Sequence, residues 1–157
     1  MQIQTTRFGV LDVKDDEVLT FTQPIIGFQE YRRFVLVPVP TDKSIRWLQS
    51  VDSSELAFLL IEPHFVMPDY KITLNPHELA EMAVTSVDEL EIYTLLVVPE
   101  DLSKVRTNLK APILINPKQR LGKQTVLEKS DYPIQCFLAA ARKDQETEEV
   151  SHARTDT

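Results

Sequence analysis

Residues 33–62 read RFVLVPVPTDKSIRWLQSVDSSELAFLLIE, and this stretch decides the fold. It holds three short runs of β-branched, aromatic and aliphatic side chains, at residues 33–37, 45–49 and 56–62. Pro38, Pro40 and clusters of serine and aspartate separate the runs. Short apolar runs divided by such turn residues are typical of neighbouring β-strands. The stretch therefore predicts a β-sheet.

The same pattern continues in both directions along the chain. An opening hairpin is expected at residues 2–8 and 10–13, with its turn near Gly9, and further strands at 18–21, 91–98, 113–116 and 124–127. There are too few helical segments to connect parallel strands. We therefore expect a mainly β fold, an antiparallel sheet that curls into a barrel-like or sandwich-like single domain with one or two short helices.

One helix start is well marked. Asn75 is a suitable N-cap, Pro76 suits the first helical position, and Glu78 completes a pattern like a capping box. An apolar stripe at helical spacing follows, and it consists of Leu79, Met82 and Ala83. The helix is expected to end before Ser86, and short turns are expected at residues 87–90 or 100–102.

The composition indicates which kinds of partner and which cellular compartment suit this protein. The 157 residues carry a net charge of −7, which disfavours direct nucleic-acid binding and suits a basic protein partner. No apolar run approaches the roughly 20 residues that span a bilayer, no signal peptide is visible, and Cys136 is the single cysteine. These features predict a cytoplasmic protein without membrane contact. We expect a folded domain at residues 1–142 and a disordered acidic tail at 143–157.

Motifs for catalysis or cofactor binding are missing from the sequence. The glycines Gly9, Gly27 and Gly122 lie in no phosphate-binding frame. The three histidines are far apart and show no metal-ligand spacing, and Cys136 has the apolar neighbours of a packed side chain. Catalytic carboxylates from separate segments stay possible. The sequence favours a protein that is not an enzyme and needs no metal or cofactor.

Four segments together resemble the FliW family, in the same order along the chain, and the third of them runs from residue 47 through Pro63 to Tyr70. They are Phe8-Gly9-Val10; residues 27–36 (GFQEYRRFVL); residues 47–52 (WLQSVD) with 56–58 (LAF), Pro63 and Pro68-Asp69-Tyr70; and residues 107–116 (TNLKAPILIN) with 122–127 (GKQTVL). The chain departs from the family pattern at residues 24–29, which lack one glycine, one proline and an acid, and around Asp52, where two serines follow.

The resemblance implies a flagellar assembly factor that works through protein–protein interaction. Members of the family bind flagellin in the cytoplasm. When flagellin is exported, the released protein binds the translational regulator CsrA and relieves repression of flagellin translation. A monomer is expected when the protein is free. Two alternatives stay open: a flagellin secretion chaperone without a regulatory role, and a small-molecule-binding β-barrel.

Candidate site residues follow from their positions in the motifs. Phe28, Phe65 and Met67 lie in expected loops and, if exposed together, would suit an amphipathic helix of flagellin. Asp52, Asp69 and Tyr70 are further contact candidates, although Asp52 also suits an Asx-turn with Ser54 and Tyr70 equally suits a loop anchor. Core or turn-supporting positions are expected at Trp47, Leu48, Gln49, Phe58, Leu60, Asn108 and Asn116.

Overall fold

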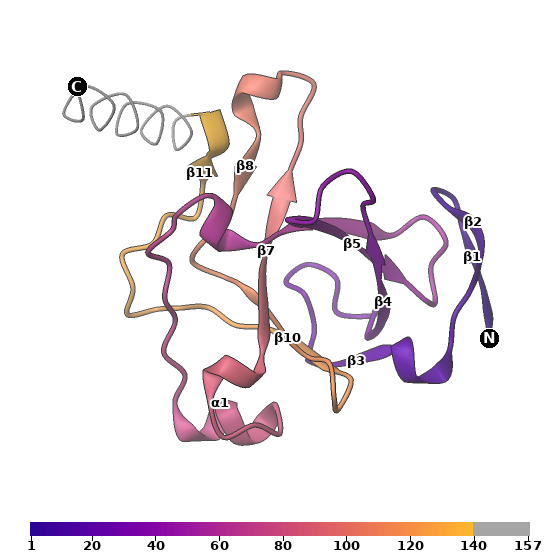
Figure 1. Ribbon diagram of the computed structural model, residues 1–157, viewed down its shortest axis with the longest axis horizontal. Coiled ribbons are helices and arrows are strands. Elements are labelled where there is room, and N and C mark those ends of the chain that lie inside the picture. The colour runs from indigo at the N-terminus through magenta and orange to yellow at the C-terminus, as the bar shows by residue number, and fades with distance from the viewer. Residues whose placement is uncertain (140–157) are drawn as a thin grey trace, which may run out of the picture.

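The computed structural model describes residues 1–139, which form one mainly β domain (Figure 1). The acidic tail at residues 143–157 lies outside the described residues. The strands are β1 (Gln2–Thr5), β2 (Gly9–Asp12), β3 (Leu19–Gln23), β4 (Arg33–Pro38), β5 (Ile45–Ser50), β6 (Ala57–Ile61), β7 (Glu91–Val97), β8 (Arg106–Thr107), β9 (Ile113–Asn116), β10 (Leu121–Gln124) and β11 (Cys136–Phe137). The helices are α1 (Pro76–Glu81) and the 3-10 turns η1 (Asp15–Glu17), η2 (Pro63–Phe65), η3 (Val87–Glu89) and η4 (Leu102–Lys104).

Seven strands close into a barrel, in the order β3-β4-β5-β6-β7-β9-β10 and back to β3. The predicted barrel-like fold is confirmed, with one difference: β10 pairs with β3 in parallel, whereas the other pairs are antiparallel. Strand direction cannot alternate all the way around a closed ring with an odd number of members. A barrel of seven strands therefore requires at least one parallel pair.

The last barrel strand, β10, begins three residues earlier than the sequence pattern predicted. A four-residue turn at 117–120 joins β9 to β10, and it pairs Asn116 with Leu121. The turn length fixes the register of the hairpin, so β10 ends at Gln124. The apolar residues Val126 and Leu127, which suggested a strand, lie beyond it in a connecting segment.

The barrel interior is filled by side chains. Its buried members are Leu19, Phe21, Ile25, Phe34, Leu48, Leu60, Tyr93, Ile113 and Ile115. Gly122 makes room for one of them, because a Cβ atom at this position would lie 2.4 Å from the ring of Phe21. The predicted core positions Leu48 and Leu60 are fully buried, and Phe58 packs against the same cluster.

Helix α1 packs against the outer face of the barrel, where Leu114 of β9 points away from the interior residues Ile113 and Ile115. The helix begins at Pro76, and the side chain of Asn75 accepts a hydrogen bond from the main-chain N–H of Glu78, as an N-cap does. The carboxylate of Glu78 does not return to Asn75, so the predicted capping box does not form. Met82 is fully buried, but Ala83 is exposed at φ +57° just after the helix, so its predicted place in the apolar stripe is wrong.

The hairpin β1–β2 forms a separate small sheet over the outside of the barrel. Beneath it lies an apolar cluster of Ile3, Val13 and Val35. Trp47 departs from the core prediction, because β5 alternates and turns Leu48 inward and Trp47 outward. The indole is half-buried there, beneath the ring of Phe8.

Candidate protein-binding surface

Two recesses lie on the surface, with volumes of about 350 and 460 Å³. The first is lined by strand ends and turns, and the second by two connecting segments and Glu78 of α1. Within residues 1–139, no three metal-capable side chains lie together. None of the described helices has the length and apolar character needed to span a membrane. Because side chains fill the barrel interior, we expect the binding site on the surface of the protein.

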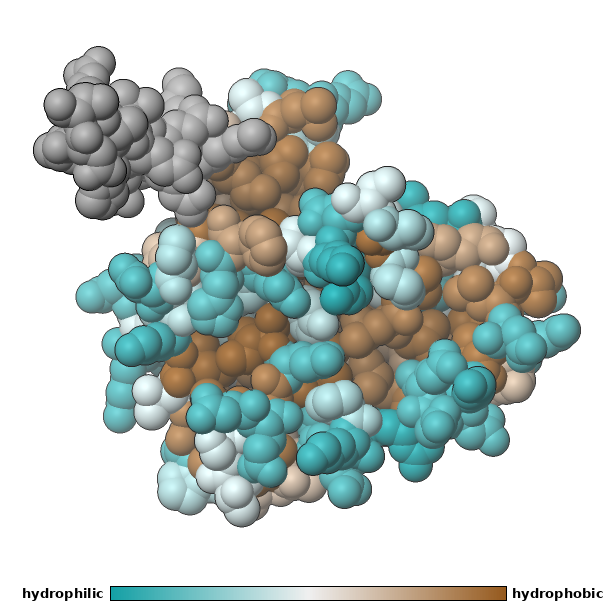
Figure 2. Space-filling view, in the orientation of Figure 1, coloured by the Kyte–Doolittle hydropathy of each residue, from teal (hydrophilic) through white to brown (hydrophobic). Residues whose placement is uncertain are grey.

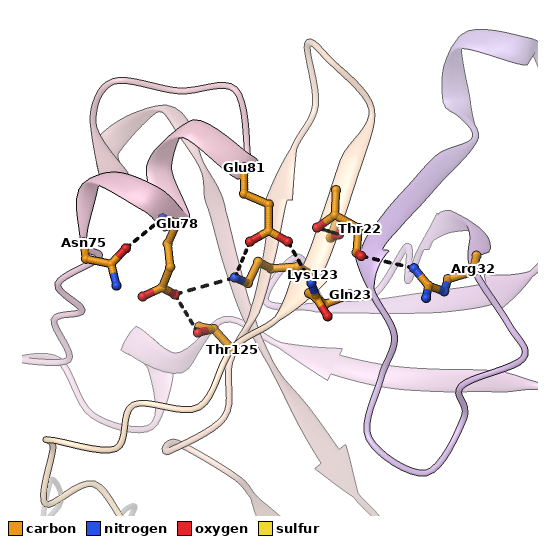
Figure 3. Close-up of polar contacts among 9 residues, drawn as sticks. Thr22, Gln23, Arg32, Asn75, Glu78, Glu81, Lys123 and Thr125 are labelled. Carbon is orange, nitrogen blue, oxygen red and sulfur yellow. Dashed lines mark hydrogen bonds and ion pairs between the residues drawn. The ribbon is translucent and has the colours of Figure 1, made fainter.

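A polar network joins α1 to strand β10 (Figure 3). The Lys123 side chain is only 8% exposed, and its Nζ atom lies 3.0 Å from Glu81 Oε2 and 3.7 Å from Glu78 Oε2. The hydroxyl of Thr125 donates to Glu78 at 2.8 Å, and the amide of Gln23 donates to Glu81 at 3.2 Å. A buried cation shared by two carboxylates holds the helix on the barrel.

The Glu81 carboxylate pairs with Lys123 in its ionised form. Burial raises the pKa of Glu81, but hydrogen bonds from Lys123, Gln23 and Thr22 outweigh it and hold the pKa below its usual value. A lowered pKa means that this carboxylate stabilises the fold at neutral pH. That contribution is lost as the pH falls through the lowered pKa.

Phe28, Phe65 and Met67 do not form one patch. The Phe28 ring packs edge-on against Phe58 at 4.9 Å, near the start of β6. Phe65 is 61% exposed in η2, which follows the other end of β6, and Met67 is half-buried. The two phenylalanines therefore lie near opposite ends of β6.

Asp52 forms an ion pair with Arg33 across the barrel rim. The Arg33 Nε atom donates to Asp52 Oδ2 at 3.2 Å, and the second carboxylate oxygen accepts from the guanidinium as well. The expected Asx-turn with Ser54 is absent, because the hydroxyl of Ser50 instead accepts the main-chain N–H groups of Asp52 and Ser53. Asp52 remains exposed on this loop.

Tyr70 anchors its loop from inside. The side chain is 2% exposed, its hydroxyl donates to the carbonyl of Leu109 at 2.7 Å, and its ring lies 4.6 Å from that of Tyr132. Burial raises the pKa of the Tyr70 hydroxyl. Asp69 is exposed and Tyr70 is buried, so of the two only Asp69 is accessible for binding.

The polar motif residues hold turns. The side-chain oxygen of Asn108 accepts the N–H groups of residues 110 and 111, and that of Asn116 accepts those of residues 118 and 119. The Asn116 amide also donates to the carbonyl of Met82, below α1. Gln49 is fully buried, and its amide donates to the carbonyls of Ser50, Ser53 and Leu56. These contacts are structural.

An apolar arm is the surface that sequence reasoning missed. Strand β7 continues past the barrel, and the chain returns through η4 to β8, which pairs with β7 on one side and with β11 on the other (Figure 1). Several large apolar side chains on this arm are exposed, and Leu102 at its tip is 71% exposed. The apolar arm comprises Val97, Val98, Leu102, Ile134 and Phe137. Figure 2 shows brown surface on the projecting hairpin.

The sequence carried a weak signal for the apolar arm. Val97 and Val98 are consecutive apolar residues beside Pro99, and Leu102 stands alone in a polar loop. A strand buried on one face should alternate, so two adjacent valines at its end indicate a change of environment. The Cys136 thiol lies on the same arm, half-buried, and burial raises its pKa above the ordinary value.

Comparisons with known proteins agree with one another. Residues 2–138 match the family described as FliW protein. The flagellar assembly factor FliW of Ruminiclostridium cellulolyticum is 31% identical over 93% of this chain and 99% of that protein. The corresponding protein of Heliobacterium modesticaldum is 40% identical over 93% of this chain and 95% of its own length.

The likeness extends to three dimensions. A crystal structure of the flagellar assembly factor FliW superimposes with a TM-score of 0.81 at 34% identity, covering 88% of this chain and 96% of that one. Family, relatives and fold agree over nearly all of the described residues, and they confirm the resemblance that the motifs indicated. This chain therefore belongs to the FliW family of non-enzymatic flagellar assembly factors.

Proposed function

We propose that this protein binds flagellin in the cytoplasm and, when free of flagellin, binds the translational regulator CsrA as a monomer. Binding of CsrA relieves the repression of flagellin translation, so flagellin synthesis follows flagellin export. The observation that carries this proposal is the apolar arm. Exposed apolar side chains gathered on a projecting hairpin suit a protein partner, whereas a filled barrel interior does not suit a small-molecule ligand.

The apolar arm suits an amphipathic helix of flagellin. Leu102 and the two valines at the end of β7 offer unpartnered apolar surface, and burial of one leucine contributes about 1.5–3 kcal/mol. Phe28, Asp52, Phe65, Met67 and Asp69 stay candidate contacts for either partner. The two partners need not share a surface. Flagellin can weaken CsrA binding from a separate site, and CsrA then weakens flagellin binding by the same factor.

Charge supports the CsrA half of the proposal. The chain carries a net charge of −7, and an acidic protein beside a basic RNA-binding surface disfavours RNA by repulsion. Long-range attraction between an acidic and a basic partner speeds their encounter, and added salt screens it. Association with CsrA should therefore slow with salt more than association with flagellin does.

The test compares two exposed apolar residues. In Leu102→Asp the change lies on the apolar arm, and in Ile26→Asp it lies on a loop outside the arm, where Ile26 is as exposed as the arm residues. Calorimetry with flagellin should show at least about tenfold weaker binding for the first variant, the equivalent of about 1.4 kcal/mol. The control should bind within about twofold of the parent.

Titration of CsrA with and without saturating flagellin completes the test. Weaker CsrA binding in the presence of flagellin, and the reverse by the same factor, is the expected result. If saturating flagellin leaves the affinity for CsrA unchanged, the result would instead support a flagellin secretion chaperone without a regulatory role. If Leu102→Asp leaves the affinity for flagellin unchanged, the apolar arm is not the surface that binds flagellin.

A further inference from the structure

Strand β11 is the edge strand of the large sheet, and it contains only Cys136 and Phe137. It pairs with β8 alone, and β8 is equally short (Figure 1). One further main-chain hydrogen bond, from the N–H of Leu138 to the carbonyl of Val105 at 3.0 Å, extends this pairing. Among the described residues, β11 is therefore joined to the sheet by few hydrogen bonds.

Side-chain packing adds little to the attachment of β11. None of the three buried apolar clusters of the described chain includes a residue of this strand. The ring of Phe137 is 38% exposed, and Ile134 just before the strand is 64% exposed. Segments with few buried apolar contacts and solvent-exposed hydrogen bonds are those that open locally while the rest of a domain stays folded.

The segment that leads to β11 is, by contrast, fastened to the barrel. We call residues 125–133 the strap. The N–H group of Leu127 donates to the carbonyl of Lys110 at 2.7 Å. The N–H group of Leu109, a fully buried residue, donates to the carbonyl of Pro133 at 3.1 Å. These bonds join the strap to the segment before barrel strand β9, so we expect it to stay in place while the barrel is folded.

Tyr132 fastens the end of the strap. Its hydroxyl accepts from the main-chain N–H of Lys71 at 2.9 Å and donates to the carbonyl of the same residue at 3.0 Å. Its ring centre lies 4.6 Å from that of the buried Tyr70. After Pro133 the chain bends at residues 134–135, and β11 follows at once. This bend separates the fastened strap from the weakly held strand.

The position of β11 determines how much of the apolar arm is present. Phe137 lies opposite Arg106 on β8, and Arg106 lies opposite Val97 on β7. Residues that face each other across neighbouring strands share one face of a sheet, so the three side chains form a row across the arm. Phe137 moves with β11, whereas Val97 and Leu102 stay on the β7–β8 hairpin. Release of β11 therefore divides the apolar surface.

We propose that β11 is a latch, which detaches from β8 by a movement about residues 134–135 while the strap and the barrel stay folded. The apolar arm is complete only when the latch is closed. A partner that contacts both Phe137 and Leu102 selects the closed form, and this regulatory role rests on the function proposed above. Opening itself is a property of the free protein, so its test needs no partner.

The experiment is amide hydrogen exchange of the free full-length protein, followed by NMR. The amide of Leu138 reports on β11, and the amides of Leu109 and Leu127 report on the strap; their hydrogen bonds are of similar length, 2.7–3.1 Å. Relative to intrinsic rates, we expect Leu138 to exchange at least tenfold faster than the other two. Low urea concentrations should leave the Leu138 rate nearly unchanged, because local opening exposes little surface.

A second amide distinguishes opening of the whole strand from fraying at its end. Alternation along an antiparallel ladder makes the N–H of Cys136 a donor to Thr107, two residues from Leu138. One opening releases both amides, so their relative exchange rates should agree within about threefold. A Cys136 amide as protected as the strap, or a ratio below tenfold between Leu138 and Leu109, would overturn the proposal.

Two proline variants provide an independent check. Leu138→Pro removes the donor to Val105 and should lower the melting temperature by less than about 2 °C. The matched control Leu127→Pro removes a donor of the strap and should lower it by at least about 4 °C. Equal losses would contradict a separately opening β11. The exchange rates of the parent protein decide the question even if a variant fails to fold.

Discussion

Replacement of Lys123 with methionine tests how α1 is held on the barrel. Methionine keeps most of the aliphatic stem and removes the charge, which leaves Glu78 and Glu81 facing each other without their cation. Removal of one partner from a fully buried pair costs about 3–5 kcal/mol. Because the two glutamate side chains keep 22% and 19% exposure, we expect a smaller loss, about 2–3 kcal/mol.

The assay is thermal unfolding of the parent and of Lys123→Met at pH 7 and near pH 4. For a domain of this size, the expected loss lowers the melting temperature by about 4–12 °C. The folded-state pKa of Glu81 is lowered, so its contribution is present above the unfolded pKa and disappears as the pH falls. Without Lys123 the cation that lowers the pKa of Glu81 is gone, so acid protonates Glu81 more readily in the variant and relieves the unpaired charge. The stability difference should therefore shrink towards pH 4.

Lys14→Met is the matched control, because Lys14 is exposed and forms no ion pair among the described residues. It should change the free energy of unfolding by less than about 0.5 kcal/mol. A loss below 1 kcal/mol for Lys123→Met, or a loss that is the same at both pH values, would refute the buried ion-pair account of this network.

Two further substitutions test the interior. Gly122→Ala should lower the free energy of unfolding by about 2–3 kcal/mol, because the added methyl group would overlap the ring of Phe21; a melting temperature equal to that of the parent would show that the ring can move aside. Tyr70→Phe should cost about 1 kcal/mol, because it leaves the carbonyl of Leu109 without its donor; calorimetric unfolding that detects no loss would mean that solvent replaces the hydroxyl.

Local patterns in the sequence were sufficient for the elements. Alternating or apolar runs bracketed by proline predicted most of the strands, and Asn75 with Pro76 predicted the start of α1. Such features depend on neighbours within a few residues, where the spacing of side chains fixes which face they occupy. Ala83 and β10 show the limit, since a left-handed residue and a hairpin register ended these elements.

Contacts between residues that are distant in the sequence were determined by the tertiary structure. Closure of seven strands produced the parallel pair of β10 with β3, and it buried Lys123 between two glutamates more than forty residues away in sequence. It also placed Phe28 and Phe65 near opposite ends of β6 and gathered the apolar arm from β7, η4, β11 and the segments beside them. By itself, the sequence determined the strands, the helix start and, through its motifs, the family. Which residues share a surface depends on long-range strand pairing, and a local pattern does not contain that information.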